Sequence, residues 1–318
     1  MLTKLTRFFL LVLTVSLLSA CGGASTSSFF QVQETDGVRT VTHRFGKTEV
    51  PLNPQRVLAL GQEYMLADLL DAGVPVVASS ANIVENIAGF DPQELASILI
   101  FPAHEPNLET LSSLKPDLII GDKYFIEKIG YDKLSGIAPT ISIDVEADWR
   151  RTYLETLSVF GKADKAKADL SAHDALVASA KSKIRANGRL ISVGTVYPDQ
   201  ALAAWVDGPT AVPQLLLDLG FTLSPSAKQA QEFGPKNGRI FLSLERLDLF
   251  AADTLILLQS AQVEGESESL ADVKANPLWA QVPAVKANRV FELDRLGYPG
   301  LRGQKALLER LLEVSLLK

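Results

Sequence analysis

The chain offers few residues that could do covalent or metal chemistry. Its single cysteine is Cys21, and its three histidines, His43, His104 and His173, lie far apart in the sequence. A dedicated zinc, manganese or copper site would normally need more histidine or cysteine ligands than these. The motifs G-x-S-x-G, G-x-G-x-x-G and H-E-x-x-H are absent, so hydrolases, dinucleotide-binding enzymes and metalloproteases lack their signatures here. We therefore predict no enzyme activity, no cofactor and no bare metal, and we expect His173 to be solvated.

The N-terminus has the pattern of an export signal. Lys4 and Arg7 precede an apolar run over residues 8–18, and the sequence Leu-Ser-Ala-Cys follows at residues 18–21. The run is shorter than the roughly 20 residues that a helix needs to span a membrane, so an uncleaved transmembrane anchor is the weaker interpretation. We predict that residues 1–20 are a signal peptide that directs the chain out of the cytoplasm.

The residues at positions 18–21 resemble the bacterial lipobox. That resemblance implies cleavage before Cys21 and acylation of its thiol, which would anchor the mature chain to a membrane, facing the periplasm or the cell exterior. Residues 21–37, which begin with the Gly- and Ser-rich stretch 22–28, are then expected to be a flexible tether. The alternative is a chance cysteine in an ordinary signal peptide.

Composition indicates a globular protein that does not bind nucleic acid. The 318 residues are 47% hydrophobic, which is enough for one substantial core or two smaller ones. The 37 acidic residues exceed the 31 basic ones, and no dense Lys/Arg cluster occurs. An acidic chain without a basic patch lacks the electrostatic footprint of a nucleic-acid partner.

The elements predicted from the first half are those of a parallel α/β lobe. Short β-branched or leucine-rich runs alternate with amphipathic stretches of helical length. We predict strands at residues 57–60, 74–78, 117–120 and 140–143 and helices at residues 63–72 and 108–114. Residues 38–160 are therefore expected to form an N-terminal lobe.

The second half repeats this plan after a long helical segment. Strands are predicted near residues 190–193, 203–206, 254–258 and 289–292, and helices near 211–219 and 303–317, so residues 188–318 should form a C-terminal lobe. Between the lobes, residues 163–186 are Ala-rich and contain no Gly or Pro. We predict that these 24 residues form a rigid helix of about 36 Å, within a segment 161–187 that joins the lobes. The alternative is a surface helix within one domain.

Several segments, taken in order, resemble the class III periplasmic substrate-binding proteins, which serve importers of ferric siderophores, haem and vitamin B12. The most specific is residues 105–121, EPNLETLSSLKPDLIIG. The others are residues 50–60 (VPLNPQRVLAL), 137–140 (IAPT), 243–247 (SLERL) and 276–293 (NPLWAQVPAVKANRVFEL). The resemblance implies two Rossmann-like lobes with mostly parallel central sheets, one long rigid connecting helix and a ligand cleft between the lobes. Such a protein should close by small angles.

The resemblance also implies docking residues. In the family, one exposed glutamate on each lobe contacts arginines of the importer's membrane subunits, and by motif position these are Glu109 and Glu245. Two separated carboxylates would set the register on a basic partner. Each is otherwise an ordinary acid at a helix start. The implied partners are an ABC importer permease and its ATPase, and we expect the chain itself to be a monomer.

The ligand cage is expected on loops that follow strands, where open α/β sheets place ligands. A ferric chelate is bulky, partly apolar and often anionic, so aromatic walls with one or two guanidinium groups suit it. The predicted ligand-binding residues are Tyr64, Tyr124, Trp149, Arg150, Tyr197, Trp205, Arg239 and Tyr298. The hydroxamate-binding relatives carry an arginine just ahead of EPNLE, whereas this chain has Phe-Pro-Ala-His at 101–104, so the resemblance does not extend to a hydroxamate held in that way.

The sequence thus predicts a lipid-anchored protein that captures a ferric siderophore and delivers it to an importer. Haem and cobalamin are the alternatives within the family: haem would want an axial Tyr or His, and cobalamin would need no charged cage. Outside that function, an extracytoplasmic enzyme on a nitrogenase-like fold would require cysteines for its clusters, which this chain does not have beyond Cys21. A signalling lipoprotein would have no use for Glu109 and Glu245.

Overall fold

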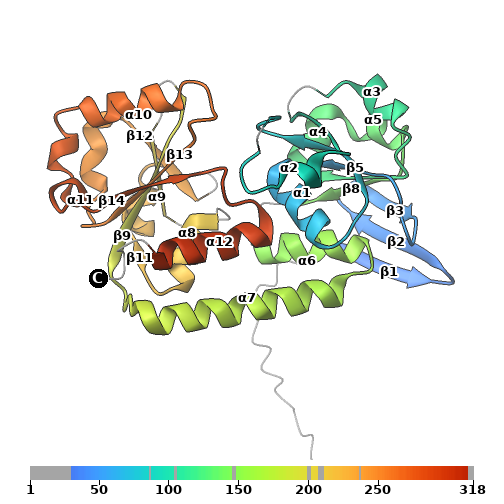
Figure 1. Ribbon diagram of the computed structural model, residues 1–318, viewed down its shortest axis with the longest axis horizontal. Helices are drawn as coiled ribbons and strands as arrows, with labels where there is room; N and C mark the ends of the chain where they lie inside the picture. Colours follow the sequence, from blue (N-terminus) through green and yellow to red (C-terminus); the bar gives the residue numbers. More distant parts are fainter. Residues whose placement is uncertain are drawn as a thin grey trace, which may run out of the picture.

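The chain folds into two α/β lobes that lie side by side above a long helix, α7 (Figure 1). This computed structural model describes residues 30–85, 87–103, 106–144, 148–198, 202–206, 211–235 and 238–313. The predicted signal peptide, Cys21 and His104 lie outside the described residues. No helix within the described part of the chain is long and apolar enough to cross a membrane.

The N-terminal lobe contains a parallel sheet of five strands in the order β6-β5-β4-β7-β8. These strands are β4 (Val57–Leu60), β5 (Val76–Ala81), β6 (Leu99–Pro102), β7 (Leu118–Asp122) and β8 (Thr140–Ile143). The strands predicted at 57–60 and 140–143 are confirmed at their bounds, and both are buried along their whole length, as is typical of a parallel sheet covered on both faces.

Helices cover both faces of this sheet. On one face, Val57 and Ala59 of β4 share a core with α1 (Gln62–Asp71) and α6 (Trp149–Val159). On the other face, Leu58 and Leu60 share a core with three short helices: α3 (Leu108–Ser113), α4 (Lys123–Ile129) and α5 (Tyr131–Ser135). The alternation follows from the strand geometry, which points successive side chains to opposite faces. A one-turn helix, α2 (Pro92–Leu95), interrupts the connection between β5 and β6.

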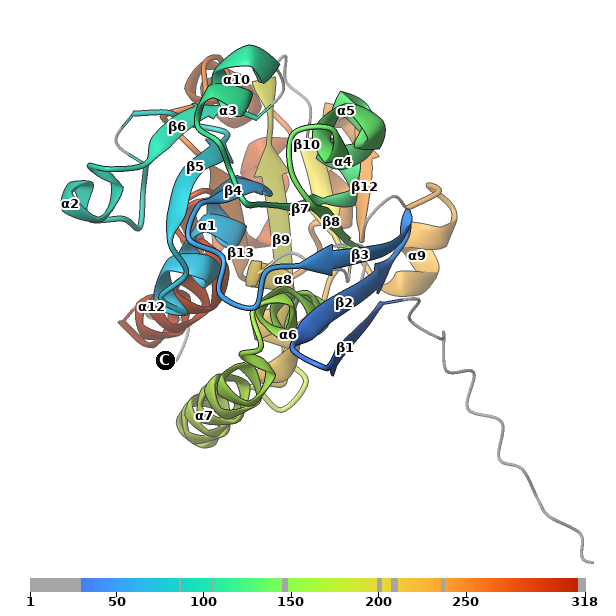
Figure 2. The ribbon, with the colours of Figure 1, turned by 90° about the vertical axis from the view of Figure 1, so that its right-hand side faces the viewer.

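A separate antiparallel sheet precedes the lobe and was not predicted. Its strands are β1 (Gln31–Thr35), β2 (Val38–His43) and β3 (Gly46–Val50), seen at the lower edge of the lobe in Figure 2. Arg39 fixes this sheet to the lobe, because its Nη1 donates to the carbonyl oxygen of Val159 at 3.2 Å. Residues 31–35, which we expected within the flexible tether, therefore form an ordered strand.

The C-terminal lobe contains a six-stranded mixed sheet in which β12-β10-β9-β13-β14 are neighbours and β11 pairs with β9. The strands are β9 (Leu190–Val196), β10 (Leu202–Trp205), β11 (Thr222–Leu223), β12 (Arg239–Leu242), β13 (Leu255–Gln259) and β14 (Val290–Asp294). β9, β13 and β14 are parallel, whereas β10 runs antiparallel to both of its neighbours.

Two apolar cores lie on opposite faces of this sheet. One contains residues of α8 (Ala211–Asp218) and α12 (Gly300–Glu313). The other contains residues of α9 (Ala227–Gln231), η2 (Leu244–Leu249), α10 (Glu266–Ala275), η3 (Trp279–Gln281) and α11 (Pro283–Lys286). The lobe therefore has the same three-layer organisation as its neighbour.

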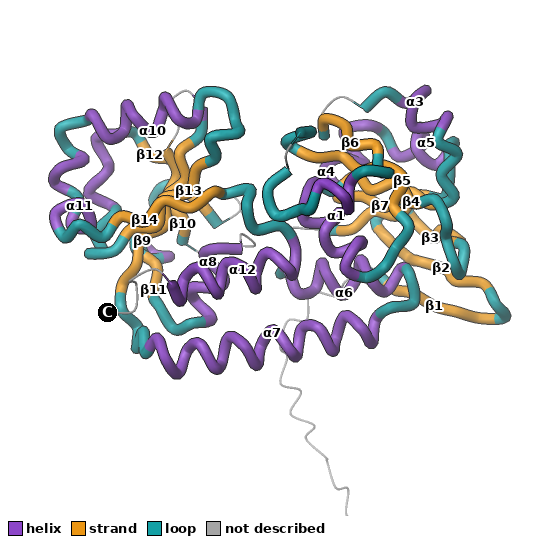
Figure 3. The backbone as a smooth tube through the Cα atoms, viewed as in Figure 1, coloured by secondary structure: helices purple, strands orange, loops and turns teal. Residues whose placement is uncertain are grey.

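Helix α7 (Ala163–Ile184) passes under both lobes, as the tube drawing in Figure 3 makes plain. Its first part contributes Ala166 to the N-terminal core, and its last part contributes Val177 and Ile184 to a C-terminal core. Between them, His173 is fully buried, not solvated as predicted, and its ring packs edge-on against Trp149 with 5.4 Å between centroids. Burial lowers the pKa of this imidazole, which favours the neutral form.

The last helix, α12, is a second bridge between the lobes. Its first turn places Leu301 in the N-terminal core, whereas Leu307 and Leu311 belong to a C-terminal core. The backbone N–H of Leu301 donates to the Oδ1 of Asp68 in α1 at 2.9 Å, and Nε of Arg302 donates to Asp71 at 3.1 Å. The chain crosses between lobes at α7, but non-covalent contacts of α12 hold them together as well.

Candidate ligand-binding site

A cleft of about 350 Å³ lies between the two lobes. Its N-terminal wall comes from the start of α1 and the end of β5, and its C-terminal wall from residues at or after the ends of several strands of the second sheet. This is the position at which open α/β sheets bind ligands. Five of the eight predicted ligand-binding residues line it: Tyr64, Tyr197, Trp205, Arg239 and Tyr298.

Arg239 is the centre of an aromatic cluster on the C-terminal wall. Its guanidinium carbon lies 5.5 Å from the ring centroid of Tyr197 and 5.2 Å from that of Trp205, distances typical of cation–π contacts. Its Nη1 donates to the hydroxyl of Tyr197 at 2.7 Å, while its Nε is buried without a hydrogen-bond partner. Among the described residues, no carboxylate forms an ion pair with Arg239. Within the described part of the chain, the positive charge of Arg239 therefore has no carboxylate partner and is available to the cleft.

Arg295 supplies a second guanidinium on the same wall. It is the first residue after β14, and it also lies over Tyr197, with its guanidinium carbon 5.6 Å from the ring centroid. Its Nε donates to Oε1 of Glu266 at 2.9 Å. Glu266 is fully buried, and its Oε2 also accepts from the backbone N–H of Ser260 at 2.7 Å. Glu266 thus fixes the position of the Arg295 guanidinium, whose remaining N–H groups are left for a ligand.

On the N-terminal wall, the polar side chains form hydrogen bonds with other groups of the same lobe. The carboxylate of Glu63 accepts from the backbone N–H of Asn82 at 2.6 Å and from its side-chain amide at 2.9 Å. The hydroxyl of Tyr64 donates to Asp122 at 3.2 Å. Burial, with the nearby Asp122 carboxylate, raises the pKa of the Tyr64 phenol, and burial also raises the pKa of Asp122. This wall presents a neutral phenol and a carboxylate whose acceptors are already occupied.

Three predicted ligand-binding residues do not line the cleft. Tyr124 begins α4, is 53% exposed, and its backbone N–H is capped by Asp122. Trp149 is packed against His173 at the base of the lobes, and Arg150 pairs with Asp174 of α7 at 3.2 Å and Asp218 of α8 at 2.8 Å. Trp149 and Arg150 are therefore corrected to residues of the junction between lobes, where they contact α7 and α8.

Several residues of the site were missed from the sequence. Arg295 and Glu266 lie 29 positions apart, and nothing in either local segment marks them as a pair. Phe241 on β12 is 53% exposed, and its ring lies 6.1 Å from that of Tyr197 and beside Arg239. A signal was available only for Arg295, because it lies a few residues after the strand predicted near 289–292 and the cage was expected on loops that follow strands.

The two predicted docking residues are exposed on different lobes. Glu109 lies in the first turn of α3, which is at the top of the N-terminal lobe in Figure 1, and Glu245 lies in η2 of the C-terminal lobe. Neither lines the cleft. In the described part of the chain, no group of three His, Cys, Asp or Glu residues could hold a metal ion.

Comparison with known proteins gives consistent matches over nearly the whole chain. A family model described as periplasmic binding protein matches residues 59–295. The Bacillus subtilis chain YhfQ is 30% identical, over 95% of this chain and 96% of its own length. The Fe(3+)-citrate-binding protein YfmC of Bacillus subtilis is 28% identical, over 93% of this chain and 91% of its own. Staphylococcus aureus SirA in complex with staphyloferrin B superposes with a TM-score of 0.72 at 25% identity, covering 86% of this chain and 97% of SirA.

Proposed function

The chain belongs to the periplasmic binding protein family, and we propose that it is the substrate-binding lipoprotein of an ABC importer that captures a ferric siderophore outside the cytoplasm and delivers it to the permease. A role in binding a siderophore is supported by the relatives and by the structural neighbours. The family consists of substrate-binding proteins, which act by capture and release of a ligand.

The observation that carries this proposal is the pair of arginines on an aromatic wall inside the cleft between the lobes. Arg239 and Arg295 both lie over Tyr197, and only Arg295 has a carboxylate partner among the described residues. Guanidinium forks bind carboxylates and other planar oxyanions with two parallel hydrogen bonds. We therefore propose an anionic iron chelate, built on carboxylates or catecholates, in which the iron arrives already coordinated.

Haem and cobalamin remain the alternatives within the family. Haem would need an axial ligand, and Tyr64 is the tyrosine of the N-terminal wall. Its raised pKa disfavours the phenolate that would bind iron. Cobalamin would leave the charge of Arg239 without a partner, because it needs no charged cage. Both features favour the anionic chelate.

The proposal includes the anchor and the partners predicted from the sequence. We propose that residues 1–20 are removed, that Cys21 carries the lipid, and that the mature monomer works with a permease and its ATPase. Names of relatives support this for their own chains, since several are lipoproteins or components of ABC transporters. Residues 22–30 would then connect the lipid to β1.

Quenching of tryptophan fluorescence tests the ligand class directly. Trp205 is the tryptophan that lines the cleft; Trp149 is packed at the base and Trp279 in a C-terminal core. The chain lacking residues 1–21 would be titrated with ferric citrate, a ferric catecholate, a ferric hydroxamate, haem and cobalamin. We expect quenching by an anionic ferric chelate but not by its iron-free form, and loss of that signal in Trp205→Phe. Silence toward all five ligands would contradict the proposal.

The docking role of Glu109 and Glu245 is a separate prediction. The double variant Glu109→Ala with Glu245→Ala should reduce uptake of the ferric chelate in cells by about tenfold or more, because both points of electrostatic contact with the permease are lost. Its affinity for the ligand in solution should be unchanged. Glu49→Ala with Glu309→Ala, which removes one exposed glutamate from each lobe, is the matched control. Normal uptake by the first double variant would refute the docking assignment.

A further inference from the structure

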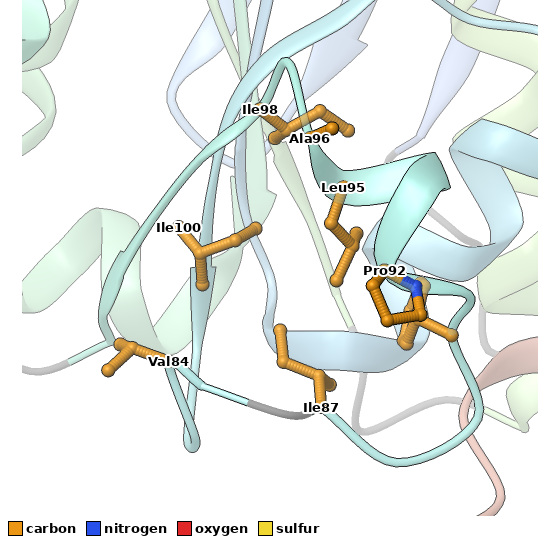
Figure 4. A pocket seen from close by; sticks show the side chains of 8 residues that line it. Val84, Ile87, Pro92, Leu95, Ala96, Ile98 and Ile100 are labelled. Carbon is orange, nitrogen blue, oxygen red and sulfur yellow. The ribbon is translucent and has the colours of Figure 1, made fainter.

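A second pocket, of about 490 Å³, lies in the N-terminal lobe, and the described side chains that line it are all apolar (Figure 4). It is bounded by the connection between β5 and α2, by α2 itself and by the approach to β6. The side chains of Ile87, Leu95 and Ile100 point into the same space from different parts of this segment. The proposed function uses none of these residues.

This pocket is open to the surface, and its inner side is formed by residues that pack against the lobe's core. Leu95, Ile98 and Ile100 pack against the main core of the N-terminal lobe, which fixes the inner side of the pocket. Val84 at the rim is 42% exposed, and Ala96 is also exposed. Apolar surface that is gathered in a hollow and left open to water is typical of a binding site.

The pocket adjoins the ligand cleft. Asn82 lines the cleft, and Val84, two residues further on, lines the pocket. Gly89 in the same connection lies against Pro299 of the cleft: a β-carbon at Gly89 would be 2.9 Å from Cδ of Pro299. In Figure 1 this connection runs along the edge of the N-terminal lobe that faces the C-terminal lobe. Residues 82–85 and 87–90 therefore lie between the two hollows, and members of this segment line one or the other.

We propose that this pocket binds an apolar arm of the ligand, so that the substrate is an amphiphilic iron chelate with an aliphatic chain. This inference rests on the proposed function, because the anionic head of the same molecule would lie on Arg239 and Arg295. The two adjoining hollows match the two halves of such a molecule: the cleft offers guanidinium groups, whereas the described side chains that line the other pocket are all apolar.

The test is a series of ferric chelates that differ only in chain length. The ferric complex of citrate monomethylamide would be compared with those of citrate monoamides that carry butyl, hexyl and octyl chains, by calorimetry on the chain lacking residues 1–21. Burying each methylene should lower Kd about fourfold until the pocket is full. Ala96→Phe, which fills the pocket, and Val84→Asp, which charges its rim, should both flatten the series while leaving the Kd of the monomethylamide complex unchanged. Ala172→Phe, on the exposed side of α7, is the matched control.

The possible outcomes separate this inference from the proposed function. If the monomethylamide complex binds and the longer chains add nothing, the apolar-arm proposal is overturned and the proposed function stands. If no citrate complex binds, iron-free hexanoate, octanoate and decanoate are titrated instead. An affinity that rises with chain length and is lost in Ala96→Phe would support the apolar-arm proposal for a ligand with a different head group. An affinity that does not rise with chain length would overturn the proposal. Self-association of the wild type that Ala96→Phe abolishes would assign the pocket to a second copy of the chain and would also overturn the proposal.

Discussion

The two walls of the ligand cleft differ in how much of their polar chemistry is already used. On the N-terminal wall, the carboxylate of Glu63 accepts from Asn82, and the phenol of Tyr64 donates to Asp122. On the C-terminal wall, Arg239 has no carboxylate partner among the described residues, and its Nε has no hydrogen-bond partner. A buried donor left unpaired is costly unless a ligand pairs with it. From this difference we propose that the C-terminal wall recognises the charge of the ligand and the N-terminal wall its shape.

The two walls are also held in a fixed relation at their base. The segment that carries Arg295 and Tyr298 leads directly into α12, and the first turn of α12 is bound to Asp68 of the N-terminal lobe. On the other side, Arg150 of α6 is paired with Asp218 of α8. These contacts, together with α7, are consistent with closure by small angles, because a wide hinge motion would break several of them.

The largest expected effect is on the C-terminal wall. In Arg239→Gln with Arg295→Gln, affinity for ferric citrate or ferric staphyloferrin B should fall by about 100-fold or more, since each hydrogen bond to a charged group contributes about 1.5–3 kcal/mol. Calorimetry on the purified chain measures this. Arg310→Gln, which removes an exposed arginine that pairs only with Glu313 among the described residues, should leave Kd unchanged. If the double variant and the wild type bound the chelate with equal affinity, the two arginines of the C-terminal wall would not be what binds it.

A smaller effect is expected at the base, where the walls are joined. Burial raises the pKa of Asp68 to about 7, with a further contribution from Asp71. Because the folded-state pKa lies above the unfolded value, the folded chain retains a proton that the unfolded chain loses above about pH 4. The stability contributed by this proton is present at low pH and is lost as pH rises through about 7. Asp68→Asn keeps the acceptor for Leu301 and should be more stable than the wild type at pH 8 by on the order of 2 kcal/mol.

Urea unfolding at pH 5, 6, 7 and 8 checks this prediction through the difference between the two proteins. That difference should grow with pH, whereas Asp164→Asn, which weakens an exposed ion pair with Lys167 at the start of α7, should show no such growth. A constant difference between Asp68→Asn and the wild type across the range would mean that Asp68 does not titrate at the junction of the lobes.

The sequence predicted the strands and helices that carry the two walls better than it predicted the side chains that line them. Strands β4 and β8 were found at their bounds because both are short β-branched or leucine-rich runs that are buried along their whole length. Strands β1 and β3 were missed because their residues are largely polar and exposed. The local sequence pattern predicts a strand where its residues are buried along the whole length. It fails where the strand is stabilised mainly by pairing with a neighbouring strand.

Residues whose roles depend on distant partners were the ones misplaced. Arg150 was expected in the cleft, but its partner Asp218 lies 68 positions further on and draws it to the base. Arg295 was overlooked because its buried partner Glu266 is invisible to a local reading. His173 was expected in water because it lies in the middle of the long helix, whereas in the structure it is buried and its ring packs against Trp149 of α6. Each error concerns tertiary contacts that no spacing within one segment encodes.

The smallest expected effect, on the N-terminal wall, is also the one that best separates the candidate ligands. Tyr64→Phe removes one hydroxyl, whose hydrogen bond goes to Asp122 and not into the cleft. Affinity for an anionic ferric chelate should therefore change by less than about threefold, with a loss of roughly 1 kcal/mol in the free energy of unfolding for the missing hydrogen bond. Parallel titrations of the wild type and the variant measure both. If haem were bound through an axial tyrosine at this position, the variant would lose both the haem and its absorbance band. That result would mean that the N-terminal wall, and not the C-terminal wall, recognises the ligand.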